Sequence, residues 1–283
     1  MYAVSPLRYP GAKWRLEKFL TALLADNGLR NGHYAEPYAG GASLAISLLY
    51  NDQVSDIHLN DLDRSIYAFW KAVIECGDEL IDRIQATKVD MDTWYEQKAV
   101  QQNKRNASII DLGFSTFFLN RTNRSGILMA GVIGGKQQTG KWKIDARFTK
   151  SNLIDRIKKI GQYKSRIHVT KFDAITFLSR RGQELPKKSL FYLDPPYFVK
   201  GQELYMNAYK PNDHGDVATQ VLNELDRPWI VSYDDVPEIR KLYKSSRPKS
   251  YVLRYSASTE RKGREIVFIS PGLKTKPSLL AEA

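Results

Sequence analysis

The sequence predicts an α/β fold: a mainly parallel sheet with helices on both faces, a C-terminal antiparallel hairpin and one long insertion. Short apolar runs with strand character alternate with helix-like stretches along most of the 283 residues. This alternation indicates a parallel sheet, because parallel neighbours need long crossovers and the helices provide them. Only a short polar segment separates the last two runs, which permits an antiparallel hairpin but not a parallel crossover.

The first predicted element is an amphipathic helix over 12–28, which Gly28 ends. The strand candidates after it are 33–38, 56–61, 167–171, 189–194, 228–233, 250–257 and 265–270. The second of them ends at Asp61 and the third begins at Ile167, a gap too long for one crossover helix or for a loop without structure. We therefore expect one domain made of 1–76 and 153–283, with an inserted module at 77–152.

The inserted module changes character halfway along. Its first half contains helix-like stretches, whereas residues 120–143 are glycine-rich and basic, which predicts a hairpin and loop. The whole chain has 43 Lys and Arg against 31 Asp and Glu, a net charge of +12. An excess of this size is typical of a protein that follows a phosphate backbone, because each neutralised phosphate releases counterions. Solubility alone is the other explanation of this charge.

The composition argues against several other kinds of protein. A single cysteine, Cys76, rules out a disulfide framework and suits a reducing compartment. The four histidines are scattered, so no metal site is expected. No apolar run is long enough to span a membrane, and the first residues lack the apolar core of a signal peptide. We expect a cytoplasmic, nucleoid-associated protein.

The most informative motif is DPPY, Asp194–Tyr197, directly after the apolar run 189–193. Ligands of α/β sheets bind at the carboxyl ends of the strands, which is where this motif is expected. The motif suits methyl transfer to an exocyclic amine, such as that of adenine. This amine is a poor nucleophile, because its lone pair is delocalised into the ring. Asp194 and the carbonyl group of Pro195 can accept the two amine hydrogens, and Tyr197 can stack on an extruded base. The alternative is a proline-rich turn that Asp194 caps.

Segments near the start of the chain suit a ligand with a nucleoside and an amino-acid part. In EPYAGG, 36–41, Gly40 allows close approach of the backbone to a ligand ahead of a helix N-terminus, although a plain structural turn looks the same. In RYPGAK, 8–13, Tyr9 offers an aromatic face and Lys13 a cation for a carboxylate, although a turn into the first helix explains the same residues.

Two acidic residues follow the second strand candidate. Asp61 can bind the two hydroxyls of a ribose, as acidic residues at this position do in dinucleotide-binding folds. It can equally be the N-cap of the helix that follows. We expect Asp63 to be a charge in the first turn of that helix.

Taken in order, the motifs RYPGAK, EPYAGG, LNDLD, FFLNRTNRSG, DPPY and VSYDD resemble the Dam-like, D12-class (alpha-group) DNA adenine methyltransferases over residues 5–270. The resemblance implies a Rossmann-like, S-adenosylmethionine-dependent methyltransferase domain with an inserted DNA-recognition domain. It implies site-specific methyl transfer to adenine N6 in double-stranded DNA, by base flipping and direct in-line transfer. One departure is Ala42, which stands where the family usually has a further glycine.

The resemblance also assigns roles to residues. It implies catalytic roles for Asp194, Pro195, Pro196 and Tyr197. It implies S-adenosylmethionine contacts for Tyr9, Lys13, Asp61, Asp173 and Asp194, and for Glu36, Pro37, Tyr38 and Gly40 of the cofactor loop. A cognate restriction enzyme is a candidate partner besides DNA, and we expect a monomer or a weak dimer.

Residues 119–142 are expected to decide which DNA sequence is methylated. Arginine recognises guanine, and asparagine or glutamine recognises adenine, through paired hydrogen bonds in the major groove, into which a two-stranded ribbon fits. The candidates for contact with DNA are Asn120, Arg121, Asn123, Arg124, Lys136, Gln138 and Lys141. The alternative is that Asn120 and Arg124 only cap and brace the hairpin.

Two other methylation reactions and a non-enzymatic role are the alternatives to adenine methylation. Methylation of cytosine C5 requires a nucleophilic cysteine, and Cys76 has no proline before it and lies far from any strand end. Methylation of cytosine N4 uses the same amine geometry and stays open. An inactive DNA-binding homologue is the other alternative, against which the intact DPPY motif argues.

Overall fold

The computed structural model describes residues 4–8, 13, 16–199, 209–245, 247, 249–253, 263–276 and 278–281. Its contacts divide the chain into two compact units, each made of two segments. The first unit combines Met1–Ala12 with Asp63–Lys171, and the second combines Lys13–Leu62 with Phe172–Ala283. Tyr9, one of the expected cofactor contacts, lies outside the described residues. The inserted module expected at 77–152 stays a prediction, because the two units are defined by compactness alone.

The second unit is built on a sheet whose strands follow the order β2-β1-β4-β5-β7-β6. The pairs β1–β2, β1–β4 and β4–β5 are parallel, whereas β5–β7 and β6–β7 are antiparallel. The strands are β1 (Gly32–Glu36), β2 (Val54–Asn60), β4 (Ser189–Leu193), β5 (Trp229–Asp234), β6 (Lys249–Leu253) and β7 (Gly263–Ile269). The predicted Rossmann-like sheet with its C-terminal antiparallel hairpin is thereby confirmed.

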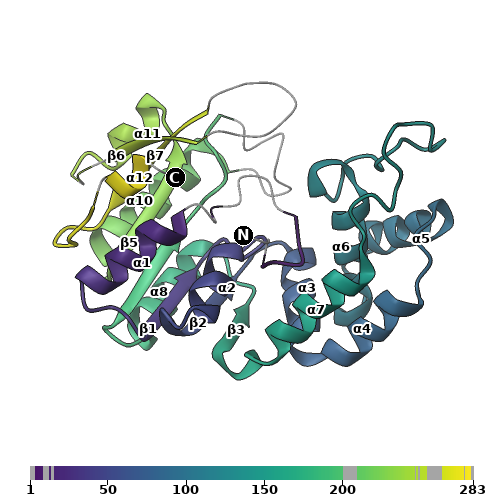
Figure 1. Cartoon of the computed structure of the whole chain (residues 1–283). Coiled ribbons are helices and arrows are strands. Elements are labelled where there is room, and N and C mark those ends of the chain that lie inside the picture. Colours follow the sequence, from purple (N-terminus) through teal and green to yellow (C-terminus); the bar gives the residue numbers. More distant parts are fainter. Residues whose placement is uncertain are drawn as a thin grey trace. The chain divides into compact units, whose positions relative to one another are not determined.

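Helices cover this sheet, and they too follow the predicted alternation (Figure 1). The first, α1 (Glu17–Asp26), ends where predicted, because Gly28 takes a left-handed φ of +66° and Asn27 Nδ2 donates to the Leu23 carbonyl. The others are α2 (Ser43–Tyr50), α8 (Ala174–Glu184), α10 (Pro211–Thr219), the π-turn η4 (Gln220–Glu224), α11 (Pro237–Leu242) and α12 (Ser278–Ala281).

The two faces of the sheet differ in chemistry. On one face, Phe191, Val231 and Phe268 pack with residues of α8, α10 and α11 in one apolar core. Neighbouring residues on a strand point to opposite faces, so Tyr192 and Ser232 lie on the other side. That second face carries the polar side chains of the site described below.

The first unit is helical and contains α3 (Arg64–Glu75), α4 (Gly77–Ala86), α5 (Met91–Gln102), α6 (Ile109–Thr122) and α7 (Lys150–Gly161), the blue and teal helices of Figure 1. It also holds the turn η3 (Lys164–Arg166) and the strand β3 (Ile167–Thr170). Gly113 explains how closely α6 approaches α3. A Cβ atom at that position would lie 2.8 Å from the Ala68 carbonyl oxygen and 2.7 Å from Ala72 Cβ.

The hairpin expected after α6 is not formed, so this part of the prediction is wrong. Within 123–149, all of which the structure describes, there is a short turn η2 (Arg124–Gly126) and a single antiparallel bridge between Asn123 and Val132. Positive φ angles recur at Ser125, Gly126, Gly134, Gly135 and Gln138. Each left-handed residue turns the chain, which prevents the extended run that a ribbon needs.

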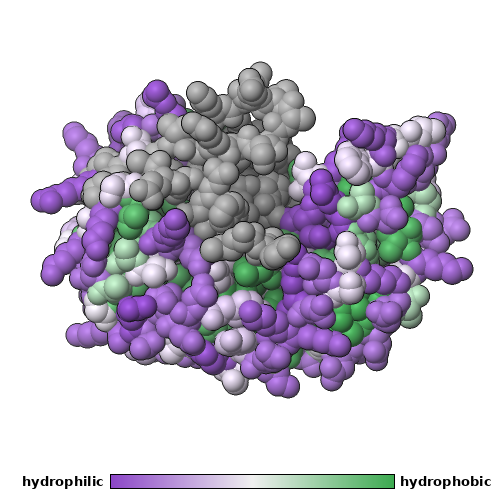
Figure 2. All heavy atoms as spheres, viewed as in Figure 1, coloured by the Kyte–Doolittle hydropathy of each residue, from purple (hydrophilic) through white to green (hydrophobic). Residues whose placement is uncertain are grey.

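The described residues on the face seen in Figure 2 are mainly polar. Figure 2 shows hydrophilic residues over most of the visible described face, with apolar residues in small separate groups. Among the described helices, none has the length and apolar character needed to cross a membrane.

Candidate active site

The DPPY loop leaves the centre of the sheet at the carboxyl end of β4, as the sequence predicts. All five residues of β4 are buried, and Pro195 and Pro196 are buried as well. Asp194 follows directly, with its side chain 23% exposed. This is the edge at which ligands of α/β sheets bind.

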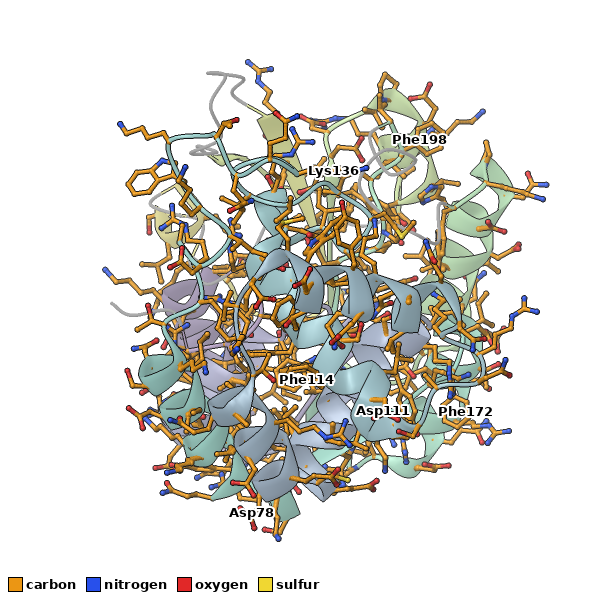
Figure 3. The ribbon with its side chains drawn as sticks, turned by 90° about the vertical axis from the view of Figure 1, so that its right-hand side faces the viewer. Asp78, Asp111, Phe114, Lys136, Phe172 and Phe198 are labelled. Atoms are coloured by element: carbon orange, nitrogen blue, oxygen red, sulfur yellow. The ribbon has the colours of Figure 1, made fainter. Side chains whose placement is uncertain are left out.

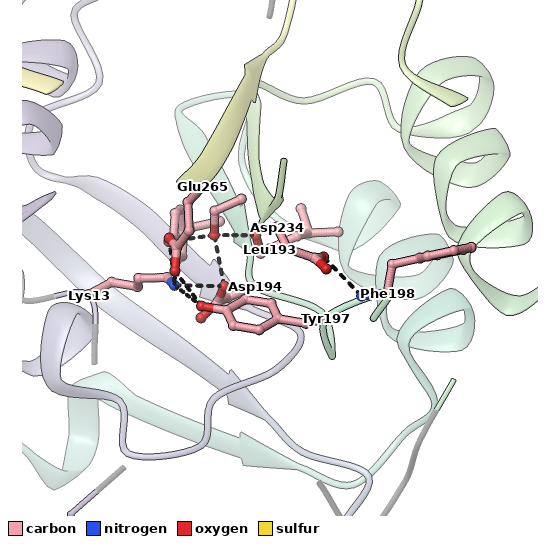
Figure 4. Close-up of polar contacts among 9 residues, drawn as sticks. Lys13, Leu193, Asp194, Tyr197, Phe198, Asp234 and Glu265 are labelled. Carbon is pink, nitrogen blue, oxygen red and sulfur yellow. Dashed lines mark hydrogen bonds and ion pairs between the residues drawn. The ribbon is translucent and has the colours of Figure 1, made fainter. Parts of the chain in front are cut away.

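Lys13 brings the expected cation to this loop (Figure 4). Its ammonium donates to Oε1 and Oε2 of Glu265 at 2.8 and 2.9 Å, lies 3.4 Å from Oδ1 of Asp194, and is 3.1 Å from the Tyr197 hydroxyl. The Tyr197 hydroxyl also donates to Glu265. One buried lysine therefore bridges the two carboxylates and contacts the tyrosine hydroxyl as well.

The charges around Lys13 determine its protonation. Burial alone would lower the pKa of its ammonium, but the carboxylates of Asp194 and Glu265 more than compensate and raise it. Lys13 is thus held as a cation. A buried ion pair is costly to break on one side, because the remaining charge loses its partner.

A short relay of hydroxyl groups orients the Asp194 carboxylate. Ser232 Oγ donates to Oδ1 of Asp194 at 2.8 Å, and the Tyr192 hydroxyl lies 2.9 Å from Ser232 Oγ. Burial raises the pKa of Asp194 to about 6, with Glu265 acting in the same direction, while Lys13 and the hydrogen bond from Ser232 oppose the rise. The carboxylate form is consequently available at neutral pH.

Asp234, at the end of β5, holds the loop from the other side. Its Oδ1 accepts the backbone N–H of Phe198 at 2.9 Å, and its Oδ2 accepts that of Val199 at 3.1 Å. Figure 4 shows the first of these contacts beside Asp194 and Tyr197. A carboxylate that accepts two consecutive N–H groups fixes the course of the backbone, so the loop is anchored at both ends.

Glu36, at the end of β1, is buried on the same face of the sheet. The Tyr34 hydroxyl donates to its Oε1 at 3.1 Å, and the backbone of Ala45, in the first turn of α2, also hydrogen-bonds to it. Burial raises its pKa to about 8, and the nearby Asp194 adds to the rise. Glu36 is therefore mostly protonated at pH 7.

The glycine turn after β1 is fixed to the end of β2. Gly40 donates its backbone N–H to Oδ2 of Asp61 at 3.0 Å, with Gly40 in a left-handed conformation. Ala42 also has a left-handed φ, of +46°, which accounts for the preference for glycine at this position.

The structure also separates the roles of Asp61 and Asp63. The N-cap of α3 is Asp63, whose Oδ1 accepts the Ser65 N–H at 2.9 Å. The expectation that Asp63 lies in the first turn is thus wrong, and Asp61 does not cap this helix. Asp61 lies one residue after β2 and contacts the glycine turn.

Asn60 connects three loops at this edge of the sheet. Its Nδ2 donates to the carbonyls of Pro37 and Phe172, at 3.0 and 2.9 Å, and its Oδ1 accepts the Phe172 N–H at 2.8 Å. Asp173 follows directly as the N-cap of α8, accepting the Thr176 N–H at 2.9 Å. Asn60 thereby holds the loops that carry Pro37, Asp61 and Asp173.

The remaining residue of the expected cofactor loop, Tyr38, lies in an aromatic group. Its hydroxyl is 2.8 Å from that of Tyr209, whose ring packs edge-on against His214. His214 is itself hydrogen-bonded to Tyr233 at 3.0 Å. Tyr38 is thus fixed beside the start of α10.

Four further residues of this site have no role assigned from the sequence: Asn60, Ser232, Asp234 and Glu265. The first three lie within the motifs LNDLD and VSYDD that carry the resemblance. Glu265 leaves a recognisable signal, because it is a charged residue at the start of the apolar run EIVFI. Ser232 occupies a similar position in the apolar run of β5. Polar residues in such runs are expected to have buried partners, although the sequence does not name the partners.

The candidates for DNA contact lie in the first unit, and several are occupied by contacts within the chain. Asn120 exchanges two hydrogen bonds with the backbone of Arg8, and Asn123 donates to the carbonyls of Ile127 and Leu128. Both asparagines are buried. The alternative that Asn120 braces this segment accordingly fits its contacts.

The loop candidates fall into two groups. Gln138 donates to the carbonyls of Ile133 and Gly135 and accepts from the Ile144 N–H, so it shapes the loop. The side chains of Arg124, Lys136 and Lys141 are exposed. Figure 3 shows Lys136 in this loop, at the end of the unit away from Asp78.

No cluster of His, Cys, Asp and Glu suited to a metal ion occurs among the described residues. Cys76 joins the end of α3 to the start of α4, at a helix boundary.

The family model of D12 class N6 adenine-specific DNA methyltransferases matches residues 9–258. No curated protein matches the chain. Among solved structures, the crystal structure of protein LPL1258 from Legionella pneumophila is 15% identical and covers 97% of this chain and 91% of its own, with a TM-score of 0.39.

Proposed function

We propose that the Asp194–Tyr197 loop of this chain transfers the methyl group of S-adenosylmethionine to N6 of a flipped adenine in double-stranded DNA. The chain belongs to the D12 class N6 adenine-specific DNA methyltransferases. Membership of this family makes the protein an S-adenosylmethionine-dependent enzyme that methylates adenine N6 in DNA. Nothing favours the alternative transfer to cytosine N4. What we propose is which residues of this chain carry the reaction.

The orientation of Asp194 is the single observation that supports the proposal most. Ser232 and Lys13 both contact Oδ1, so Oδ2 is the oxygen that can accept a hydrogen of the adenine amine. The Pro195 carbonyl is the natural acceptor for the second hydrogen. Two fixed acceptors favour a pyramidal nitrogen, whose lone pair is then directed at the methyl donor.

Tyr197 is positioned for stacking on the extruded base. Its hydroxyl is held by Glu265 and Lys13, and the Lys13 ammonium lies 5.3 Å from the centre of its ring. A ring fixed at its far end keeps one orientation, which reduces the entropy lost when a base stacks on it. Pro196 precedes it and limits the backbone to few conformations.

The residues around the glycine turn fit S-adenosylmethionine. The cofactor supplies an activated methyl group on a sulfonium, so no side-chain nucleophile is needed. We propose that Asp61 holds the ribose hydroxyls and that Glu36, freed of its proton, faces the ammonium of the methionine part. Asp173 and Tyr38 lie on loops at the same edge of the sheet and complete the proposed binding surface with Pro37 and Gly40. The predicted contacts of Tyr9 and Lys13 with the cofactor stay predictions.

The exposed basic residues Arg124, Lys136 and Lys141 carry the proposal for DNA recognition. They lie on the loop after α6 and have the charge and reach for base edges and phosphates. Asn120, Asn123 and Gln138 support this segment through the contacts described above, and Arg121 donates to the carbonyls of Arg147 and Pro6. A cognate restriction enzyme, a cytoplasmic location, and a monomer or weak dimer remain predictions.

A methyl-transfer assay on unmethylated duplex DNA, followed by digestion to nucleosides, tests the proposal. We expect labelled N6-methyl-2′-deoxyadenosine as the product, and full activity in excess chelator, since no step uses a metal. Labelled N4-methyl-2′-deoxycytidine, or no labelled nucleoside, would refute the proposed reaction. Exposed side chains Arg124, Lys136 and Lys141, changed one at a time to alanine, should alter the methylated sequence without weakening S-adenosylmethionine binding.

A further inference from the structure

Four arginines of the first unit gather around the segment Ser5–Arg8. The Arg156 guanidinium donates through Nη1 to the Ser5 carbonyl at 2.9 Å. Arg121 donates through Nε to the Arg147 carbonyl at 2.8 Å and through Nη1 to the Pro6 carbonyl at 3.4 Å. Arg8 donates through Nη1 to the Asn123 carbonyl at 3.2 Å.

These contacts hold Arg8, Arg121 and Arg156 without neutralising them, and the charge of Arg147 lies near enough to lower the pKa of Arg8 and Arg121. Every partner just named is a backbone carbonyl, and none of the four arginines pairs with a carboxylate among the residues that the structure describes. A guanidinium has five N–H donors, and each carbonyl contact uses one of them. Most of the donors of Arg8, Arg121 and Arg156 therefore remain for another acceptor.

The cluster is electrostatically unfavourable as it stands. Burial, together with the charges of Arg8, Arg156 and Arg147, lowers the pKa of Arg121 to about 9. Burial and Arg147 likewise lower the pKa of Arg8, and burial lowers that of Arg156. These arginine side chains are fixed in place, have lowered pKa values and have no carboxylate partner among the described residues. Such a cluster indicates a site that binds an external anion.

We propose that Arg8, Arg121, Arg147 and Arg156 form a binding site for a phosphodiester of the DNA backbone, which rests on the proposed function. Guanidinium groups match phosphate oxygens in pairs of hydrogen bonds, and the single negative charge of a phosphodiester relieves the repulsion among them. Arg147 is exposed and gives access, while the other three are half-buried.

The proposed phosphate site lies next to the loop that is expected to contact the bases. Arg121 lies in the last turn of α6, directly before the loop that carries Arg124, Lys136 and Lys141. A phosphate fixed at the base of this loop sets the register of the duplex, while the exposed side chains of the loop meet the bases. Contacts with phosphates position a protein on DNA and contacts with bases select the sequence.

The test compares Arg147→Gln with Lys158→Gln in the full-length protein. Each variant removes one positive charge, and Lys158 is exposed on α7, the helix that carries Arg156. Affinity for a labelled non-cognate duplex is measured over a range of salt concentrations. We expect Arg147→Gln to weaken binding and to reduce the slope of log affinity against log salt by about 1, and Lys158→Gln to leave both unchanged. Arg147→Lys should keep most of the slope because it keeps the charge.

Thermal unfolding without DNA adds a second readout. Arg147→Gln should unfold at the same temperature as the parent or higher, because it removes repulsion from the cluster. The proposal is overturned if Arg147→Gln keeps the parent slope, or if it unfolds at a lower temperature than Lys158→Gln. Failure of the proposed function looks different, since the parent would then transfer no methyl group while the effect of Arg147 on the slope persisted.

Discussion

Glu265 accepts two hydrogen bonds from the Lys13 ammonium, at 2.8 and 2.9 Å, across 252 residues of sequence. The same ammonium lies 3.4 Å from Asp194, so the position of the proposed catalytic carboxylate depends on a residue of the last long strand. Glu265 also accepts from the Tyr197 hydroxyl. Its loss would disturb the lysine, the tyrosine and the aspartate together.

We expect Glu265→Gln to lower both stability and methyl transfer. Removing one partner of a buried ion pair costs about 3–5 kcal/mol, because the other charge is left without compensation. Thermal unfolding and methyl transfer at saturating cofactor measure the two effects. In the double variant, Lys13→Met with Glu265→Met, part of this stability should be recovered because neither charge of that pair remains, but activity should not be, because Asp194 loses the Lys13 ammonium. Full activity in that double variant would show that the network is only structural.

The hydrogen bond from Ser232 to Asp194 makes a prediction about pH. The carboxylate form of Asp194 is needed as an acceptor, so kcat/KM should fall on the acid side as Asp194 becomes protonated near its pKa of about 6. Ser232 lowers this pKa, as Lys13 does, while Glu265 raises it and Glu36 lies nearby. Ser232→Ala should therefore shift the acid limb to higher pH.

Tyr192→Phe is the control for this shift, because it removes the neighbour of Ser232 and keeps the hydrogen bond to Asp194. Its acid limb should move less than that of Ser232→Ala. An acid limb at the same pH in the parent and in Ser232→Ala would exclude Asp194 as the titrating group.

Glu36 makes a separate prediction about stability. Its pKa is raised from 4.5 in an open environment to about 8 in the folded protein. The favourable contribution of its protonated form is complete below pH 4.5 and is lost as the pH rises to about 8, because the unfolded chain ionises first. Glu36→Gln does not ionise. The unfolding temperature of Glu36→Gln relative to the parent should thus rise over this interval, and a constant difference would contradict the raised pKa.

Asp61 and Asp63 offer a matched pair of variants. Asp63 caps α3, so Asp63→Ala should cost about 1 kcal/mol of stability and leave the affinity for S-adenosylmethionine unchanged. Asp61 contacts the glycine turn, so Asp61→Ala should weaken cofactor binding strongly and stability less. Isothermal titration calorimetry measures the affinity of both variants for S-adenosylmethionine, and thermal unfolding measures their stability. Equal affinity in the two variants would remove Asp61 from the cofactor site.

The sheet and the strand-end residues could be predicted because both depend on local patterns. Alternating apolar runs give the strands, and Asp61 and Asp194 directly follow runs of this kind. The support of the site depends on pairing between distant strands instead. Ser232 and Asp234 lie on β5, opposite Val267 and Glu265 of antiparallel β7, and no local pattern specifies that register.

The segment after α6 shows the opposite error. Amide and guanidinium groups in FFLNRTNRSG match the chemistry of base recognition, but Asn120 is occupied by the backbone of Arg8. This contact joins residues 112 positions apart, so the sequence gives no indication of it. The glycine-rich stretch 120–143 predicts a hairpin and loop, yet positive φ angles at Ser125 and Gln138, as well as at glycines, turn the chain repeatedly.

The role of Asp194 in methyl transfer is tested most directly by Asp194→Ala in a single-turnover assay at saturating S-adenosylmethionine and duplex DNA. Single-turnover conditions report the chemical step and separate it from binding and product release. The rate of formation of N6-methyladenine should fall by about 10²-fold or more, because one of two fixed acceptors for the amine hydrogens is lost. A rate within about tenfold of the parent, under the same conditions, would contradict the assignment of Asp194 as the catalytic acceptor.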